Sequence, residues 1–346
     1  MKPDDRDRRQ RQRVTERVVV DASDPAALTA ALSGPGAWLR AGKLVAFPTE
    51  TVYGLGANAL DEDAVRAVFA AKGRPSFNPL IVHVADLEHA TDVVRELSPT
   101  ARELAAAFWP GALTLVLPRR AELPDVVTGG LDTVGVRVPA HPVARALITA
   151  AGVPVAAPSA NPFTQVSPTT AQHVLDQLDG RIDAVVDGGP TDVGIESTVV
   201  AVEGERRLVL LRHGGVSGEQ LEQRGFTVVE PSDREDAGVA RRSPGRIERH
   251  YAPGIPLVGV ARASSGDLVL PAAGGPFAVL ARGDARGADG AAAREVLPVD
   301  AAGFARGLYA ALHRIASSGC EVAYVEALPD EAAWRAVADR LRRAGL

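Results

Sequence analysis

Cysteine, aromatic residues and long apolar runs are scarce in this sequence. Its 346 residues include one cysteine, Cys320, so the chain can build neither a disulfide framework nor a cysteine-based zinc site. A lone cysteine is usually a small buried apolar residue. No apolar run approaches the ~20 residues that a membrane span requires, and residues 1–17 lack the hydrophobic segment of a secretory signal. These absences favour a cytoplasmic protein without membrane contact.

Strong net charge and several catalytic motifs are absent as well. The net charge is −5, which gives no overall electrostatic argument for binding nucleic acid or a membrane surface. The Walker pattern G-x-x-x-x-G-K-[ST] and the serine-hydrolase pattern G-x-S-x-G do not occur, and the seven histidines lack metal-ligand spacing. Anion binding must therefore come from local clusters of cations, and no residue is predicted to ligate a metal.

The composition changes along the chain in a way that predicts four segments. Residues 1–17 alternate arginine with aspartate and glutamine and are predicted to be a disordered tail, with a basic arm that touches RNA as the alternative. Residues 18–230 alternate strand-like and helical patterns, which predicts an α/β domain with one large, twisted, mixed sheet. Residues 231–256 form a proline-containing linker, and residues 257–346 have the pattern of a smaller, Rossmann-like α/β domain.

The clearest helix prediction covers residues 61–72. Apolar residues recur there at the i, i+3, i+4 spacing of one helix face. Asp61 is placed to cap the first turn, and Gly73 is placed to end the helix. This segment is therefore expected to be a regular, capped helix of the large domain.

A glycine pattern just upstream raises the possibility of a dinucleotide enzyme. Gly54 and Gly56 fit G-x-G-x-x-G/A and follow an apolar run. A dinucleotide-binding fold also needs an acidic residue roughly 20 positions later to hold the ribose. The corresponding segment reads KGRPSFNPLIVHV and is basic. This mismatch argues against an NAD-dependent dehydrogenase, which stays an alternative interpretation.

One cation interrupts an apolar strand pattern. In DTVGVRVP the valines alternate onto one face, which leaves Thr133, Gly135 and Arg137 on the other. A charge within such a strand is costly unless it meets a partner or an anion. Arg137 is therefore either half of a structural ion pair or part of an anion site.

A second cluster of cations follows the predicted helix. Lys72 ends that helix, where the helix dipole favours a cation in any case. Arg74 lies in a loop restrained by Pro75 and Pro79, with Asn78 just before the next strand. Cations on a fixed loop beside a polar sheet face suit phosphate binding, whereas the simpler interpretation is a helix cap and a solvated arginine.

The third cluster lies in the linker. Arg246, Arg249, His250 and Tyr251 stand there between prolines. A spacer has no need for cations and an aromatic residue in this arrangement. A lid that closes over an anionic nucleotide would need both.

Eight motifs occur in order along the chain. They read FPTETVYGLGANA, KGRPSFNPLIVHV, FWPGALTLVL, GVRVPAHP, APSANP, VSPTTAQHV, DGGP with GIESTVV, and LLRHG. This order resembles the YrdC-like domain. The linker SPGRIERHYAPGIP and the domain after it resemble the long form of the L-threonylcarbamoyladenylate synthase family, so the resemblance covers residues 18–346. Residues 246–248 and 162–163 depart from the usual family pattern.

The resemblance implies two sets of binding residues and a turn at the active-site cleft shaped by Gly54 and Gly56. The implied threonine contacts are Thr49, His83, Arg137, Ser197 and the backbone near Ala157. The implied ATP contacts are Lys72, Arg74, Asn78, Thr133, Ser159, Asn161, Ser167, Arg212, His250 and Tyr251.

The family condenses L-threonine, bicarbonate and ATP into threonylcarbamoyl-AMP and releases pyrophosphate. A partner transferase complex then moves the threonylcarbamoyl group to tRNAs that read ANN codons. The resemblance implies the same activity here, with Lys72 and Arg74 as the catalytic residues that stabilise charge on the leaving pyrophosphate. A Mg²⁺ ion on the triphosphate is expected, and tRNA contact would be transient. An RNA-binding module without catalysis is the remaining alternative.

Overall fold

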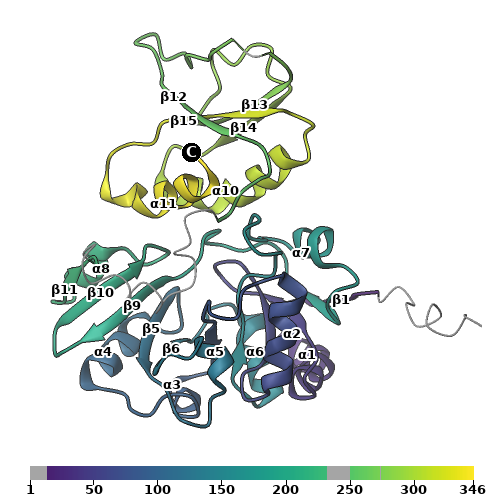
Figure 1. Ribbon diagram of the computed structural model, residues 1–346, viewed down its shortest axis with the longest axis vertical. Helices are drawn as coiled ribbons and strands as arrows, with labels where there is room; N and C mark the ends of the chain where they lie inside the picture. The colour runs from purple at the N-terminus through teal and green to yellow at the C-terminus, as the bar shows by residue number, and fades with distance from the viewer. Residues whose placement is uncertain (1–13, 232–249, 273) are drawn as a thin grey trace, which may run out of the picture.

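The protein folds around two β-sheets, one of eleven strands and one of four (Figure 1). The structure is a computed structural model, and it describes residues 14–231, 250–272 and 274–346. The large sheet contains β1 (Glu16–Val19), β2 (Val45–Pro48), β3 (Tyr53–Asn58), β4 (Ile81–His83), β5 (Leu113–Pro118), β6 (Thr133–Arg137), β7 (Val155–Ala156), β8 (Ala184–Asp187), β9 (Thr198–Glu203), β10 (Arg207–Arg212) and β11 (Thr227–Val229). The small sheet contains β12 (Leu257–Val260), β13 (Phe277–Arg282), β14 (Ala293–Leu297) and β15 (Val322–Glu326).

Helices connect most of these strands. They are α1 (Pro25–Arg40), α2 (Glu62–Lys72), α3 (Leu87–Ala90), α4 (Pro99–Phe108), α5 (Asp125–Thr128), α6 (Pro142–Ala151), α7 (Ala171–Leu178), α8 (Gly218–Glu222), α10 (Ala301–Ala316), the 3₁₀ turn η3 (Ala332–Trp334) and α11 (Arg335–Ala344). Within the described ranges, none of them is both long and apolar enough to cross a membrane.

The large sheet is mixed, with the order β1-β8-β2-β3-β7-β4-β6-β5-β9-β10-β11. β4 and β6 run parallel in a register that sets His83 opposite Arg137. β7 is antiparallel to β4, and β5 is antiparallel to β6. The predicted α/β class, with a large mixed sheet and a smaller second sheet, is confirmed.

The helix predicted over residues 61–72 is also confirmed as α2. The Asp61 side chain accepts hydrogen bonds from the backbone amides of Asp63 and Ala64, which would otherwise have no partner in the first turn. Gly73 ends the helix with φ of 64°, a left-handed conformation that glycine adopts without steric penalty.

Helices bury one face of the large sheet and part of the other. One face packs against α2, α4 and α7, whose Val68, Leu104 and Val174 are fully buried. The other face packs against α1 and α6 through Leu32 and Leu147. The rest of the second face carries a smaller cluster of strand residues that includes Ile81, Val116 and Val209.

The start of the chain differs from its prediction. Residues 1–17 were expected to be a disordered tail, but Glu16 and Arg17 belong to β1, which pairs in parallel with β8. Arg17 also forms an ion pair of 2.6 Å with Asp187. An edge strand with mostly exposed side chains lacks the alternation by which strands are recognised, so the boundary at residue 17 is wrong. Residues 1–13 lie outside the described part of the chain.

Gly54 and Gly56 do not form the expected turn. Both lie within β3, which is antiparallel to β2. A Cβ atom at Gly56 would lie 2.8 Å from Cε1 of Phe47, and one at Gly54 would lie 3.2 Å from Cβ of Ala157. Glycine is therefore needed here for close packing between strands, and the phosphate-binding turn of a dinucleotide enzyme is absent from this segment.

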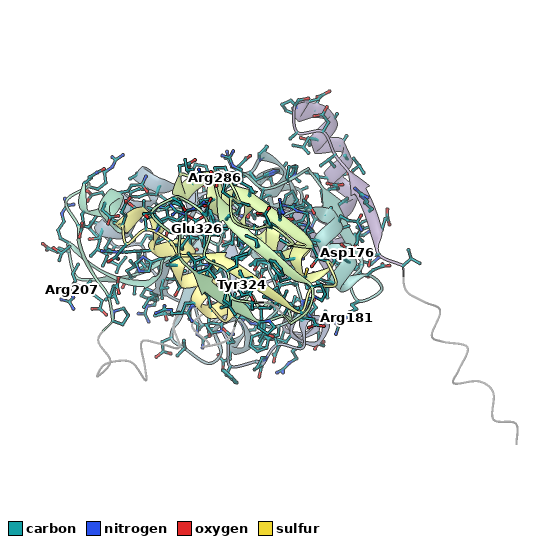
Figure 2. All side chains as sticks on the ribbon, turned by 90° about the horizontal axis from the view of Figure 1, so that it is seen from above. Asp176, Arg181, Arg207, Arg286, Tyr324 and Glu326 are labelled. Carbon is teal, nitrogen blue, oxygen red and sulfur yellow. The ribbon has the colours of Figure 1, made fainter. Side chains whose placement is uncertain are left out.

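The small sheet is parallel throughout, in the order β12-β15-β13-β14. Its helices α10 and α11 lie between it and the large sheet (Figure 1). Seen from above, strand β15 with Tyr324 and Glu326 crosses the middle of the molecule, whereas Arg207 lies at one side (Figure 2). Most of the predicted linker lies outside the described residues, and its described end runs from residue 250 to β12. The small sheet thus presents its helices to the ends of the large-sheet strands.

Candidate active site

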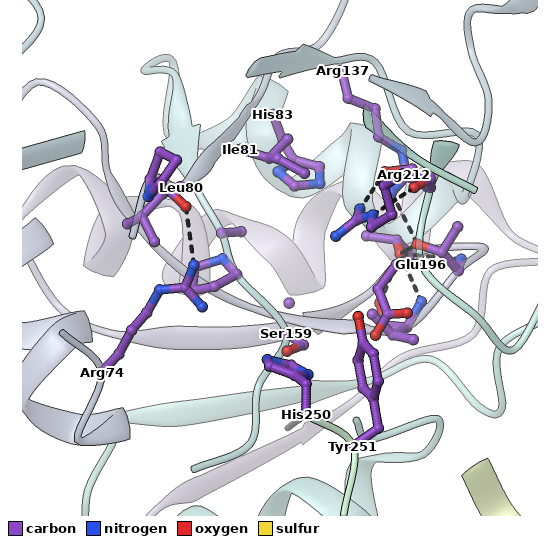
Figure 3. A pocket seen from close by; sticks show the side chains of 18 residues that line it. Arg74, Leu80, Ile81, His83, Arg137, Ser159, Glu196, Arg212, His250 and Tyr251 are labelled. Carbon is purple, nitrogen blue, oxygen red and sulfur yellow. Dashed lines mark hydrogen bonds between the residues drawn. The ribbon is translucent and has the colours of Figure 1, made fainter. Parts of the chain in front are cut away.

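A cavity lies where the central strands of the large sheet end, with His83 and Arg137 on one side and His250 and Tyr251 on the other (Figure 3). It brings together most of the residues that the sequence predicted. The predicted residues that line it are Thr49, Arg74, His83, Arg137, Ala157, Ser159, Ser197, Arg212, His250 and Tyr251.

The cavity is narrow. The space among its side chains is about 560 Å³ when the mouth is included, but only about 50 Å³ is wide enough for the centre of a water molecule. Ligand pockets usually measure roughly 300 Å³ or more. A ligand of nucleotide size therefore needs the lining to open, and the short segment with His250 and Tyr251 forms one wall of that lining.

Arg137 is held from three directions. Its Nε donates to the carbonyl of Gly111 at 3.0 Å, and its Nη1 donates to Oγ1 of Thr51 at 2.9 Å. Its Nη2 lies 2.7 Å from Oε1 of Glu50, which is also buried. Neither Glu50 oxygen has a well-oriented hydrogen bond among the described residues, so this contact is an ion pair. Both sequence interpretations of Arg137 therefore apply: it forms a buried ion pair, and it lines the cavity.

Glu50 remains ionised in this setting. Burial by itself would raise the pKa of Glu50, but the charge of Arg137 and less well-oriented hydrogen bonds to the carboxylate together hold the pKa below the usual value. The Arg137 guanidinium thus faces the cavity with a fixed counter-charge behind it.

His83 is neutral at physiological pH. Burial, with the nearby positive charge of Arg137, lowers the pKa of His83 to about 3. Its Nδ1 is buried and has no hydrogen-bond partner among the described residues. The ring packs edge-on against Phe47 at 6.2 Å between centroids. His83 therefore offers an uncharged imidazole next to Arg137.

Hydroxyl groups from two further strand ends complete this side of the cavity. Oγ1 of Thr49 donates to the carbonyl of Val52 and lies 2.7 Å from Oγ1 of Thr51. Oγ of Ser197 lies 2.8 Å from Oγ1 of Thr114. These bonds fix both hydroxyls in single orientations without charge.

Two arginines face the remaining part of the cavity. Nε of Arg212 donates to the carbonyl of Ser197 at 3.0 Å and Nη2 donates to its hydroxyl at 3.1 Å. Nη2 of Arg74 donates to the carbonyl of Pro79 at 3.1 Å, and its guanidinium lies 6.0 Å from the ring of Phe163. Burial lowers the pKa of Arg74 to about 9. Both groups are cations fixed by backbone carbonyls.

Lys72 does not reach the cavity surface. Its Nζ is buried and donates to the carbonyl of Ser159 at 2.5 Å and to the carbonyl of Asn161. Burial and the neighbouring charge of Arg74 place the pKa of Lys72 well below its usual value. Lys72 instead holds the loop after β7 in place, so the structure does not support direct phosphate contact by this side chain.

The other predicted residues outside the lining are Asn78, Thr133, Asn161 and Ser167. Thr133 begins β6, whereas Arg137 ends it, so three residues of strand lie between them. Buried amide atoms of Asn78 and Asn161 lack partners among the described residues. Ser167 donates to Oε1 of Glu196 at 2.7 Å, directly behind the cavity wall.

The described end of the linker is tightly docked. The amide of His250 donates to the carbonyl of Arg343 at 2.8 Å, and the His250 ring meets Phe163 edge-on at 6.1 Å. Tyr251 is 1% exposed and adopts φ of 63°, which is unusual for a residue other than glycine. Its ring stacks on Tyr309 at 5.5 Å between centroids. This segment therefore connects the cavity to α10 and α11.

The sequence analysis missed a buried carboxylate that lines the cavity. Glu196 accepts hydrogen bonds from Tyr309 at 2.9 Å and from Nε of Arg340 at 2.7 Å. Burial would raise the pKa of Glu196, but the charges of Arg340 and Arg212 lower it to about 2. A charged residue just before the apolar strand STVVAV was a signal for Glu196. No local pattern distinguished Arg340 from its arginine neighbours.

A metal has no dedicated set of protein ligands among the described residues. They contain no group of three or more histidine, cysteine, aspartate or glutamate side chains placed to hold an ion. The two carboxylates nearest the cavity are each engaged by an arginine. Any divalent cation at this site would depend on oxygen ligands that arrive with a substrate.

Comparisons with known proteins agree over residues 37–214 and 216–345. The family model described as "Telomere recombination" matches residues 37–214, and the one described as "Threonylcarbamoyl-AMP synthase, C-terminal domain" matches residues 216–345. The chain is 50% identical over 222 residues to threonylcarbamoyl-AMP synthase of Pyrococcus abyssi, covering 64% of this chain and 65% of that protein. It is 48% identical over 245 residues to the Bacillus subtilis enzyme of that name, covering 70% of each. The crystal structure of P. abyssi Sua5 complexed with L-threonine matches with a TM-score of 0.84 and 38% identity, over 96% of this chain and 98% of that one.

Proposed function

The chain belongs to the threonylcarbamoyl-AMP synthase family, and on that premise we propose that it condenses L-threonine, bicarbonate and ATP into threonylcarbamoyl-AMP and pyrophosphate. One observation carries the proposal: a single narrow cavity has the Arg137–His83 pair at one end and Arg74 at the other. An amino-acid carboxylate and a phosphate chain are both anionic, so a site that joins them needs cations at two separate places.

The end with Arg137 suits threonine. The guanidinium can take the carboxylate through two hydrogen bonds, and Glu50 behind it keeps it fixed. Neutral His83 adds no positive charge that would repel the substrate ammonium group. The hydroxyls of Thr49 and Ser197 and the backbone near Ala157 would orient the threonine hydroxyl and amine.

The end with Arg74 suits ATP. Arg74 and Arg212 would contact the phosphates and stabilise the charge that develops as pyrophosphate leaves. Ser159 with His250 and Tyr251 would enclose the nucleotide. The remaining predicted ATP contacts require a rearrangement on binding, because they lie outside the present lining; they are Lys72, Asn78, Thr133, Asn161 and Ser167.

The chemistry follows from positioning. The threonine amine combines with bicarbonate to give a carbamate and water, and a carbamate oxygen then attacks the α-phosphorus of ATP. The bond to the bridging oxygen breaks, and pyrophosphate departs with its electrons. No side-chain nucleophile is needed, so fixed orientation supplies most of the rate enhancement. Mg²⁺, held mainly by phosphate oxygens and water, would neutralise charge on the triphosphate.

The linker end acts as a lid in this proposal. Tyr251 is almost fully buried at the cavity wall, and the cavity is too narrow for ATP while it stays there. Closure after binding would exclude water from the mixed anhydride, which hydrolyses readily. Tyr251→Ala should therefore bind ATP but release less intact threonylcarbamoyl-AMP per pyrophosphate. Product and pyrophosphate appearing in equal amounts would refute the lid.

The product would be consumed in the cytoplasm by a transferase complex that modifies tRNAs reading ANN codons, with transient tRNA contact at most. The glycine pattern lies in a strand, so a dehydrogenase is not supported. Pyrophosphate release from ATP tests the proposal directly. It should require both threonine and bicarbonate, whereas binding of RNA without such release would favour a non-catalytic module.

A further inference from the structure

The electrostatics of the cavity contain an apparent conflict. Glu196 lines a cavity that also presents Arg74, Arg137 and Arg212. A carboxylate at such a place would repel an anionic ligand and attract the arginines meant for it. The Glu196 side chain is 9% exposed, so little water is available to screen its charge.

Arg340 resolves this conflict from behind the cavity wall. Its Nε lies 2.7 Å from Oε2 of Glu196, and the residue is completely buried. Its Nη2 also donates to the carbonyl of His213 at 2.9 Å, and its guanidinium lies 5.4 Å from the ring of Tyr251. Arg340 belongs to α11, so its charge comes from the part of the chain that builds the small sheet.

The rest of the Glu196 coordination is neutral and equally specific. Oε1 accepts from the hydroxyl of Ser167 at 2.7 Å, and Oε2 also accepts from the hydroxyl of Tyr309 at 2.9 Å. Both carboxylate oxygens are thus engaged on the side away from the cavity. Meanwhile Arg212 directs Nε and Nη2 at Ser197.

We propose that Arg340 is a positioning residue for nucleotide binding: by neutralising Glu196 from behind, it keeps Arg212 directed at the cavity and removes a negative charge from the path of the phosphates. This inference rests on the proposed function, because it takes ATP as the anionic ligand. It gives the small sheet a defined contribution to the site of the large sheet. Arg137 is the charged residue of the threonine end, whereas Arg212 reaches that end only through its bonds to Ser197, so threonine binding should change less than ATP binding.

The test compares, in the full chain, a variant that loses only the charge of Arg340 with a variant that loses the charges of both Arg340 and Glu196. Arg340→Met should raise the Kd for ATP on the order of 30-fold, because it leaves a buried carboxylate without its counter-charge. The double variant Arg340→Met/Glu196→Gln removes both charges. Its Kd for ATP should return to within about 5-fold of the original, the remaining loss reflecting the missing hydrogen bonds from Arg340 to His213 and Asp339. Arg342→Met is the matched control, because Arg342 lies on the same helix and pairs with Asp339 as Arg340 does, but its side chain is 73% exposed.

Calorimetric titration with ATP and, separately, with threonine measures the Kd of each variant for both ligands. Recovery in the double variant, with a Kd for threonine that changes less than the Kd for ATP throughout, supports charge neutralisation. A double variant as weak as Arg340→Met, equal loss of threonine binding, or an unaffected Arg340→Met overturns it. If the unsubstituted chain binds ATP and threonine but releases no pyrophosphate, only the proposed reaction is refuted. If it binds no ATP, both the proposed reaction and the role of Arg340 are refuted. Melting temperatures identify any variant that is unfolded, and an unfolded Arg340→Met with a folded double variant still supports the charge argument.

Discussion

Two buried arginine–glutamate pairs border the same cavity, and they face it in opposite ways. In the first, Arg137 faces the cavity and Glu50 lies behind it, at 2.7 Å. In the second, Glu196 faces the cavity and Arg340 lies behind it, also at 2.7 Å. The first pair therefore presents the positive charge of Arg137 to a ligand, whereas in the second pair Arg340 neutralises the negative charge of Glu196.

The two pairs also differ in how the chain assembles them. Arg137 ends β6 and Glu50 lies between β2 and β3, so both belong to the strands and connections of the large sheet. Glu196 and Arg340 are 144 residues apart and meet only when α11 packs against the large sheet. The comparison suggests that amino-acid recognition is built into the large sheet, and that nucleotide recognition depends on docking of the small one.

The largest expected effect comes from breaking the first pair. Arg137→Ala should weaken threonine binding by about 2–5 kcal/mol, because the carboxylate loses its charged partner, and it should leave ATP binding nearly unchanged. Arg145→Ala, an exposed arginine of α6, is the control. Parallel titrations with the two ligands check this.

Removal of Arg137 also leaves Glu50 buried without a counter-charge, which can destabilise the fold. Arg137→Met/Glu50→Gln avoids that problem and should bind threonine as poorly as Arg137→Ala. If the double variant binds threonine normally, Arg137 serves only as a structural ion pair.

Substrate selectivity sharpens the comparison at the same end of the cavity. Serine lacks one methyl group, so an apolar contact should disfavour it by about 1–3 kcal/mol. Alanine also lacks the hydroxyl and should react more slowly still, because the hydroxyls of Thr49 and Ser197 lose their partner. The ratio of kcat/KM values measures both. Equal rates with serine and alanine would remove Thr49 and Ser197 from the recognition of the substrate hydroxyl.

A smaller effect on ATP binding is expected at Phe163, beside the ATP end of the cavity. Phe163 contacts the ring of His250 and the guanidinium of Arg74, and it replaces the small residue common in the family. Phe163→Ala should weaken ATP binding by about 0.5–1.5 kcal/mol, the usual range of such aromatic contacts. Phe77→Ala, at a ring that is 65% exposed, should change nothing. An unaltered Kd for ATP in Phe163→Ala would show that the linker end holds its place without this contact.

The smallest effect concerns how the free energy of unfolding depends on pH, through a histidine pair between α7 and α10. His173 of α7 stacks on His313 of α10, with ring centroids 4.0 Å apart. Burial and the charge of His313 lower the pKa of His173 to about 4, and burial lowers the pKa of His313. Asp176 opposes both shifts, whereas Arg314 adds to the first.

The unfolded chain therefore binds more protons than the folded one below about pH 6.5, so stability is complete above that pH and declines toward pH 4. His173→Gln should reduce the loss of unfolding free energy between about pH 7 and about pH 5. Denaturant titrations at both values check this. An identical loss in the variant would assign the acid sensitivity to other buried histidines, such as His83 and His250.

Local signals in the sequence predicted local structure well. The cap, spacing and terminal glycine of α2 all lie within 13 consecutive residues, so the helix could be identified without knowing its neighbours. Alternation within one strand likewise identified Arg137 as a buried cation. By contrast, β1 has mostly exposed side chains and β3 reads YGLGAN, and neither shows a strand pattern.

Long-range contacts account for what the sequence analysis missed at the site. Lys72 was predicted to contact phosphate, but the fold brings two carbonyls of the loop after β7 to its Nζ. Arg340 lies in the segment DRLRR, which resembles a solvated helix face. Only the packing of α11 against the large sheet shows that Arg340 is completely buried, whereas the side chain of Arg342 is 73% exposed.

The central claim is that one cavity joins threonine, bicarbonate and ATP. Incubation with isotopically labelled bicarbonate, followed by mass spectrometry of the nucleotide products, tests it most directly. The account predicts a threonine-dependent adduct of AMP that carries the label, lost in Arg137→Ala and reduced in Arg340→Met. Consumption of ATP without a labelled adduct, or an adduct that forms without threonine, would contradict it.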